Sequence, residues 1–307
     1  MPPGSRSLGL YVTLLFVLPL AAGCPRSPLS DNVMRTSDIV YGMGYVRDDA
    51  ADSGYRLQKL YFDLLEPTDI PATSRPAVLM IHGGSFMRGS KTDENLVAVA
   101  NGLAEAGYVC FLINYRLDGD NPPHPGLWDP APEEAKALDI PSLAAVRAAF
   151  VDAKTAMRHI RANSTVYGID PARIAIWGES AGAFAALAAG LTEPEEFAND
   201  GEGFPVPPEN NPGVNPRPAA IVECWGSAVF TPNAFEPGDP PIMIFHGLND
   251  TTVPFIFALD IQARCQQAGI PYRMYLIRGG EHGCWDCEYD GKDLTTLTIE
   301  FLRDFMP

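Results

Sequence analysis

The 307-residue sequence predicts an α/β fold, a mostly parallel sheet with helices on both faces. Two observations lead to this prediction. Short, continuous apolar runs recur along the chain, as is typical of strands buried on both faces of a parallel sheet. Segments with helical apolar spacing alternate with them. The hydrophobic content of 46% is ample for one large core, so residues 40–307 are expected to form a single domain.

The N-terminus carries the pattern of an export signal. Arg6 precedes an apolar stretch over residues 8–20, which is too short to span a bilayer as a helix, and small residues follow it. We predict a signal peptide over residues 1–23 and a flexible tether over residues 24–39. Residues 20–24 resemble a bacterial lipobox, so Cys24 is expected to be lipidated in a cell-envelope lipoprotein. The alternative is ordinary cleavage and a periplasmic or secreted protein.

The domain is expected to open with a strand pair over residues 40–46 and 57–65, joined by a loop rich in Asp and Gly. The first strand pair is predicted to be antiparallel. Apolar runs predict further strands at residues 77–81, 108–114, 173–177, 219–225, 241–245 and 272–277. Helical spacing or composition predicts helices at residues 95–106, 146–160, 183–191, 253–268 and 294–305.

Two proline-rich stretches interrupt this alternation, at residues 117–139 and 192–218. Long loops in compact domains are usually functional or disordered. We interpret both as insertions that overhang one edge of the sheet and shape a substrate cleft. The alternative is that they are ordinary surface loops.

The most informative motif is Gly178-Glu179-Ser180-Ala181-Gly182, a G-x-S-x-G sequence between an apolar run and a helix-forming run. This context predicts a strand, a sharp turn and a helix, which expose a nucleophilic Ser180 at the edge of the sheet. The motif is short enough to occur by chance. The companions of Ser180 therefore decide what it means.

A serine nucleophile needs a base, usually histidine. Of the five histidines, His82 belongs to a glycine motif, and His124 lies among prolines of an insertion. His159 falls opposite the apolar stripe of its helix and is expected to face solvent, and His246 ends a strand where structural roles are common. His282 remains, in a glycine-rich turn after the last predicted strand, where sites of open α/β sheets form.

The acid that orients the base should follow an earlier strand on the same edge. Asp250 follows the strand at residues 241–245 and is predicted to hydrogen-bond the His282 ring. An acidic residue at a helix N-terminus is also stabilised by the helix dipole alone. The rivals Glu281 and Asp286 are too close to His282 in sequence to come from a separate strand.

An acyl-transfer intermediate also needs donors for its oxyanion. The Ala181 N–H, directly after the nucleophile, is one candidate. His82-Gly83-Gly84 follows its own buried strand, and Gly83 and Gly84 are predicted to supply the other amides.

The remaining composition limits the partners. A formal charge of −16 argues against nucleic acid and anionic membrane surfaces. Cys284 and Cys287 form a C-x-x-C pair without a second pair at zinc-site spacing, so a local disulfide is the preferred interpretation. No metal or organic cofactor is predicted.

In this order, Ser180, Asp250 and His282 resemble the α/β-hydrolase superfamily over about residues 40–307. The segments at residues 82–84, 114–117 and 167–174 resemble its esterase and lipase branch. Asp250-x-x-Val253-Pro254 is similar to the BD-FAE-type esterases (bifunctional feruloyl and acetyl-xylan esterases) and to prolyl-oligopeptidase-like hydrolases. Where the branch commonly has a third glycine, this chain has Ser85, which leaves open which amides form the oxyanion hole.

The resemblance implies hydrolysis of carboxylic esters by an acyl-enzyme mechanism, with a short- to medium-chain, small-molecule or carbohydrate-linked ester as the substrate. Phe86, Trp225 and Trp285 are candidate pocket walls and are equally plausible as core residues. A lipase, a prolyl-oligopeptidase-like peptidase and a non-catalytic binding module are the alternatives. The last of these usually lacks a triad member or an oxyanion glycine.

Overall fold

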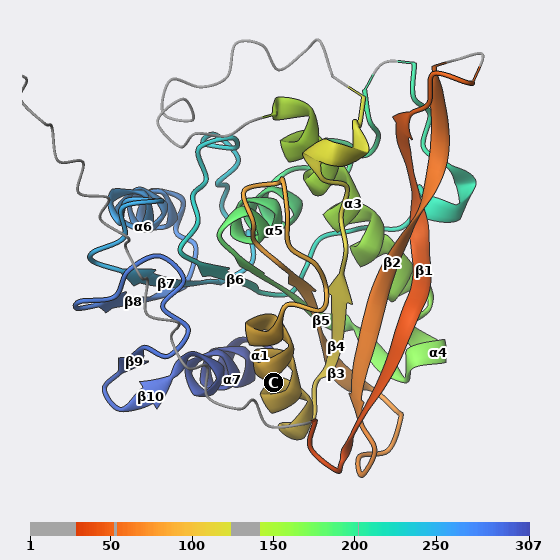
Figure 1. The fold of residues 1–307 in the computed structure, drawn as a ribbon. Coiled ribbons are helices and arrows are strands. Elements are labelled where there is room, and N and C mark those ends of the chain that lie inside the picture. Colours follow the sequence, from red (N-terminus) through yellow and green to blue (C-terminus); the bar gives the residue numbers. More distant parts are fainter. Residues whose placement is uncertain (1–28, 52–53, 124–141, 202) are drawn as a thin grey trace, which may run out of the picture.

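The computed structural model describes residues 29–51, 54–123, 142–201 and 203–307. Its centre is an eight-stranded sheet in the order β1-β2-β4-β3-β5-β6-β7-β8 (Figure 1). The strands are β1 Val33–Arg47, β2 Tyr55–Pro67, β3 Arg75–Ile81, β4 Val109–Ile113, β5 Ile169–Glu179, β6 Ile221–Cys224, β7 Ile242–Gly247 and β8 Tyr272–Ile277.

Strands β3 to β8 are parallel to one another, and only β2 and its neighbours pair in the antiparallel sense. The mostly parallel sheet and the antiparallel first pair are confirmed. Because the parallel strands all end at one edge, the loops that follow β3, β5, β7 and β8 lie near one another.

Helices cover both faces of the sheet, as predicted (Figure 1). Helices α1 (Glu94–Glu105) and α7 (Leu294–Phe305) bury apolar side chains on one face. Helices α3 (Leu143–Ala162), α5 (Ala181–Leu191) and α6 (Ile256–Ala268) do so on the other. Short elements complete the fold: α4 Ser164–Tyr167, 3-10 turns at Asp118–Asp120 and Pro208–Asn210, and the hairpin β9 Glu288–Tyr289 with β10 Lys292–Asp293.

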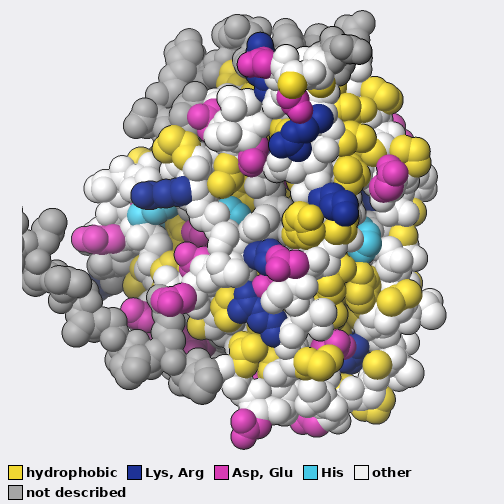
Figure 2. Space-filling model, turned by 45° about the vertical axis from the view of Figure 1, so that its right-hand side comes forward, with side chains coloured by type: hydrophobic (Ala, Val, Ile, Leu, Met, Phe, Trp, Pro, Cys, Tyr) yellow, Lys and Arg dark blue, Asp and Glu magenta, His cyan; other side chains and the backbone are white. Residues whose placement is uncertain are grey.

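Strand β1 begins at Val33, so residues 33–39 belong to the sheet and not to the predicted tether. The polar residues of this segment bind the buried Asp63 of β2: Arg35 Nε lies 2.9 Å from Asp63 Oδ2, and the Asp38 N–H donates to Asp63 Oδ1. Apolar residues do not alternate along this segment because its polar residues attach it to Asp63, a residue distant in sequence. Figure 2 shows that apolar and charged side chains are interspersed on the face of the molecule that this view turns forward.

The described part of the insertion at residues 192–218 packs along β1 and α3. Asn210 accepts a hydrogen bond from the Met43 N–H and donates one to the Met43 carbonyl. The Lys154 ammonium of α3 donates to the carbonyls of Glu193 and Glu196. This insertion braces the first strand pair. Of the insertion predicted at residues 117–139, only residues 117–123 are described.

The predicted signal peptide and Cys24 lie outside the described residues, as does His124. Within the described ranges, no helix combines the length and apolarity that a bilayer crossing requires.

A fully buried ion cluster joins β1, α3 and the second insertion at Arg116, which follows β4. Arg116 Nη2 lies 2.7 Å from Asp152 Oδ1 and 2.7 Å from Asp200 Oδ1, and Arg116 Nη1 donates to the Tyr45 carbonyl. Removing Asp152 would leave the buried guanidinium with Asp200 as its one carboxylate partner and with N–H groups that have lost their acceptors.

We therefore expect Asp152→Ala to lower the free energy of unfolding by about 3–5 kcal/mol. Asp49→Ala is the control because its ion pair with Arg47 is exposed, and its loss should cost less than about 1 kcal/mol. Urea denaturation of both variants measures the difference. Equal, small losses would show that Arg116 is satisfied without Asp152.

Candidate active site

Ser180 occupies a strained turn between β5 and α5. Its backbone has φ 50° and ψ −121°, a conformation that residues other than glycine rarely adopt. A Cβ on Gly178 would overlap the Gly182 carbonyl, and a Cβ on Gly182 would overlap the Ile81 carbonyl at the end of β3. Glycine at both positions therefore lets the turn close against the central strand.

The side chains of Ser180, His282 and Asp250 form an unbroken hydrogen-bond chain. Ser180 Oγ lies 2.9 Å from His282 Nε2, and His282 Nδ1 lies 2.8 Å from Asp250 Oδ2. The loops after β5, β8 and β7 supply the three residues. The structure thus brings together the residues selected from the sequence, and Glu281 and Asp286 are exposed.

Asp250 is surrounded by donors. Its Oδ1 accepts the backbone N–H groups of Thr252 and Val253, at 2.9 and 2.8 Å. Burial alone would raise the pKa of Asp250, but the hydrogen bonds from His246, His282 and Val253 lower it well below the usual range. Asp250 is therefore ionised and fixed in orientation, as an acid that steadies an imidazolium must be.

The loop after β3 corrects one oxyanion prediction. The Gly83 N–H donates to Glu179 Oε1, so it is already occupied. Among the described residues, the N–H groups of Gly84, Ser85 and Ala181 have no acceptor. Ser85, with φ 56°, lines the pocket beside Ser180 together with Ala181. The amide of Ser85, where the common motif has its third glycine, thus replaces Gly83 as a candidate donor.

Glu179 is a site residue that the sequence argument missed. Its carboxylate is partly buried and accepts hydrogen bonds from the Gly83 N–H and, at 3.0 Å, from Trp225 Nε1. Burial raises the pKa of Glu179, although both hydrogen bonds lower it. One carboxylate thus ties the loop after β3 to the end of β6. The only signal in the sequence was an acidic residue at the variable position before Ser180.

A small cavity of about 30 Å³ adjoins Ser180. It is lined by Ser85, Phe86, Ser180, Ala181, Phe184, Thr252 and Val253. Phe86, one of the candidate pocket walls, thus lies beside Ser180. Trp225 and Trp285 line no part of it: they pack edge to face, 5.0 Å apart, and the Trp225 ring lies 6.5 Å from the His282 ring.

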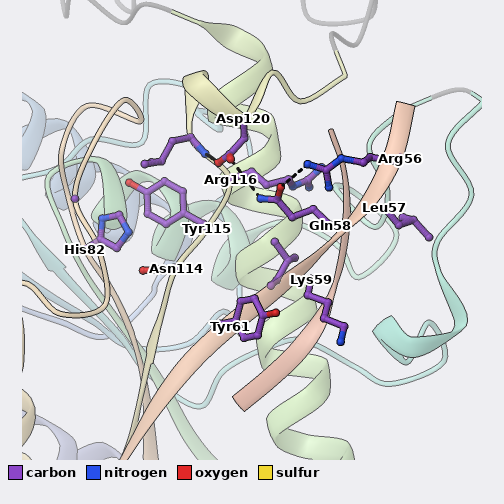
Figure 3. Close-up of a pocket in the computed structure, with 13 residues that line it drawn as sticks. Arg56, Leu57, Gln58, Lys59, Tyr61, His82, Asn114, Tyr115, Arg116 and Asp120 are labelled. Carbon is purple, nitrogen blue, oxygen red and sulfur yellow. Dashed lines mark hydrogen bonds between the residues drawn. The ribbon is translucent and has the colours of Figure 1, made fainter. Parts of the chain in front are cut away.

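A larger pocket of about 390 Å³ lies behind the loop after β3 (Figure 3). It is walled by residues 56–61 of β2 and by residues 114–117 and Asp120. His82 lines it beside Tyr115, with the rings stacked at 4.4 Å (Figure 3). Burial lowers the pKa of His82 to about 4, so the ring is neutral and its Nδ1–H donates to the Gly83 carbonyl.

The other polar groups are not catalytic candidates. His159 was predicted to face solvent, but its ring packs on Phe62, and its Nε2 lies 2.9 Å from the Tyr167 hydroxyl. Cys284 and Cys287 are free thiols, which differs from the expected disulfide. Within the described residues no cluster of three His, Cys, Asp or Glu side chains could hold a metal ion.

Comparison with family models gives two matches. The BD-FAE model matches residues 62–126 and 141–234, about half of the chain, including the loop after β3 and the Ser180 turn. The prolyl oligopeptidase family model matches residues 225–306, which carry Asp250 and His282. The two matches meet at the end of β6.

Known relatives of this chain are named as esterases or ester hydrolases. Esterase LipC of Mycobacterium tuberculosis is 26% identical over 72% of this chain, and probable carboxylic ester hydrolase LipM of the same organism is 25% identical over 76%. The chain spans 56% of the length of each. Esterase 2 of Thermogutta terrifontis shares the fold, with a TM-score of 0.64 at 21% identity over 90% of this chain and 96% of that one.

Glu179→Gln should lower kcat by about tenfold, because the glutamine amide has one acceptor oxygen for two donors: its NH2 group must face either the Gly83 N–H, which frees the loop after β3, or Trp225 Nε1. Steady-state kinetics on p-nitrophenyl acetate measure the loss. Asp239→Asn is the control, since Asp239 is a buried carboxylate paired with Arg217 at 3.0 Å. Unchanged kcat in Glu179→Gln would show that this carboxylate does not position the loop.

Proposed function

Because the chain belongs to the BD-FAE family, we propose that it is a carboxylic ester hydrolase that uses Ser180, His282 and Asp250 in an acyl-enzyme mechanism. The observation that carries the proposal is the hydrogen-bond chain from Ser180 Oγ through His282 to Asp250. The names of the curated relatives support ester chemistry. The whole protein's substrate is part of the proposal.

In the first half-reaction Ser180 Oγ attacks the ester carbonyl while His282 Nε2 takes the hydroxyl proton. Asp250 stabilises the imidazolium through Nδ1–H and keeps the ring in this tautomer. The tetrahedral intermediate collapses as His282 gives the proton to the leaving alcohol. The acyl group then remains on Ser180.

In the second half-reaction a water molecule takes the place of the alcohol. His282 removes its proton as the water oxygen adds to the acyl carbonyl. The second tetrahedral intermediate collapses by breaking the bond to Ser180 Oγ, which takes the proton back from His282 as the carboxylic acid leaves. In both halves the oxyanion binds the free amides of Ala181 and of Ser85 or Gly84, which are fixed before the reaction and cost no reorganisation.

The cavity beside Ser180 supports a short acyl group. A volume of about 30 Å³ is only about twice the space that one water molecule needs. Phe86 and Phe184 close it, with ring centroids 6.2 Å apart, and Phe184 packs in turn on Phe230 at 6.0 Å. We therefore place acetyl and propionyl esters ahead of long-chain lipids as substrates.

A peptidase is the second candidate function, because the prolyl oligopeptidase family model covers the Asp250 and His282 segment. The same triad can cleave amides. A panel with p-nitrophenyl acetate and a proline-containing p-nitroanilide peptide separates the two. Faster turnover of the peptide would replace the esterase proposal.

Ser180→Ala should reduce kcat for p-nitrophenyl acetate by roughly 10⁵- to 10⁶-fold, as loss of the nucleophile does in other serine hydrolases. Ser164→Ala, in α4, is the control and should retain full activity. Thermal unfolding shows that both variants are folded. Persistent turnover in Ser180→Ala would mean that another group is the nucleophile.

Phe184→Leu should enlarge the acyl pocket, so the ratio of kcat/KM for butyrate over acetate rises about tenfold. Phe150→Leu is the control, because Phe150 lies in the same aromatic cluster without lining the pocket. Chain-length series with p-nitrophenyl esters measure the ratio. An unchanged ratio would place the acyl group elsewhere.

A further inference from the structure

Beyond the triad, a second histidine contacts Asp250. His246 lies in β7 and is fully buried. Its Nε2 lies 2.8 Å from the Val253 carbonyl and 3.3 Å from Asp250 Oδ2, the same oxygen that His282 Nδ1 contacts. Both neighbours of Nε2 are acceptors, so this nitrogen carries a proton. Asp250 Oδ2 is thus held between two imidazole rings.

The other ring nitrogen of His246, Nδ1, faces the carboxylate of Glu223. His246 Nδ1 has no hydrogen-bond partner in the described part of the chain, and Glu223 Oε1 lies 4.0 Å away. Glu223 is fully buried in β6, where its Oε1 accepts the Gly226 N–H at 2.6 Å and its Oε2 has no partner. A buried carboxylate whose Oε2 has no partner and a ring nitrogen without a partner therefore lie close together, away from water.

One proton neutralises the charge of the pair, with the two groups 4.0 Å apart and not hydrogen-bonded to each other. A buried, unpaired carboxylate beside a neutral ring costs several kcal/mol, so the pair binds a proton at neutral pH. Burial raises the pKa of Glu223 to about 7, so the carboxyl and the ring compete for this proton. The ring keeps it because His246 lies between two carboxylates, Glu223 and Asp250, and these raise its pKa although burial lowers it.

Other titratable groups around the pair do not compete. Burial raises the pKa of the Cys224 thiol in β6 and of the Cys265 thiol in α6, so both stay neutral. Glu179, in β5, is engaged by Gly83 and Trp225. Asp250 and His282 also face this cluster, as does the Cys284 thiol, whose pKa burial raises.

We propose that His246, held as an imidazolium by Glu223, is a positioning residue that fixes Asp250 from the side opposite His282. The inference rests on the proposed function of Ser180, His282 and Asp250. A cation behind Asp250 weakens the attraction of this carboxylate for a protonated His282. The site is therefore expected to stay active to lower pH.

Glu223→Gln tests the ion pair, because glutamine keeps the shape and removes the charge. His246 should then lose its extra proton at neutral pH, and Asp250 should lose the cation behind it. We expect the acidic limb of the kcat/KM profile for p-nitrophenyl acetate to move up by about half a pH unit. His246→Gln, which keeps an N–H donor without the charge, should move the limb in the same direction.

The matched control is Glu66→Gln, a partly buried carboxylate paired with Arg75 at 2.9 Å at the other end of the strands. It should leave the limb in place. A merely structural role for Glu223 and His246 would lower thermal stability without moving the limb. That result would overturn the proposal, as would a limb that moves to lower pH.

A readout without turnover separates this inference from the proposed function. In protein labelled with ¹⁵N-histidine, the His246 ring should carry protons on both nitrogens at pH 7 in the wild type and on one in Glu223→Gln. His246→Gln assigns its signals among the five histidines. A neutral His246 ring in the wild type at pH 7 would overturn the ion pair even if ester hydrolysis is found. A doubly protonated ring without turnover would overturn only the proposed function.

Discussion

The close approach of the Ser180 turn to the end of β3 is the constraint on which the site depends. Gly182 lies against the Ile81 carbonyl with no room for a Cβ. This contact brings the nucleophile beside the loop that begins at His82, which would otherwise be an unrelated turn. The strained backbone of Ser180 persists because the central strands on both sides fix it. The position of Ser180 in this turn is what supports its proposed role as the nucleophile.

Buried carboxylates from neighbouring strands organise the rest. Glu179 in β5, Glu223 in β6 and Asp250 after β7 lie within one edge of the sheet, and each has different partners. Glu179 binds two neutral donors, Asp250 binds two rings and two amides, and Glu223 faces His246. Charges of one sign can share this region because each is balanced locally. The proposed imidazolium of His246 completes that balance.

The large features of the fold could be predicted because they depend on local patterns. Apolar runs identified every strand of the large sheet, although β1 begins seven residues before its predicted start. The early part of β1 was missed because its polar residues bind Asp63, a contact that no periodicity reveals. His159 was misplaced for a similar reason: a solvent-facing position on the helix is covered by Tyr167. The insertion at residues 192–218 braces β1 through Asn210, a contact between distant segments that its prolines do not indicate.

The sequence by itself determined the candidate triad, since a nucleophile motif and a process of elimination among five histidines and the loop acids leave few choices. It also determined the fold class, because strand and helix periods are local. The tertiary structure decided which amide faces the oxyanion: Gly83 and Ser85 are close in sequence, but only the fold places Glu179 against one of them. It also decided that His246 contacts Asp250 in addition to His282. Burial and the direction of a side chain depend on distant segments, so the roles of Glu179, Glu223 and His246 emerge only when β5, β6 and β7 lie side by side.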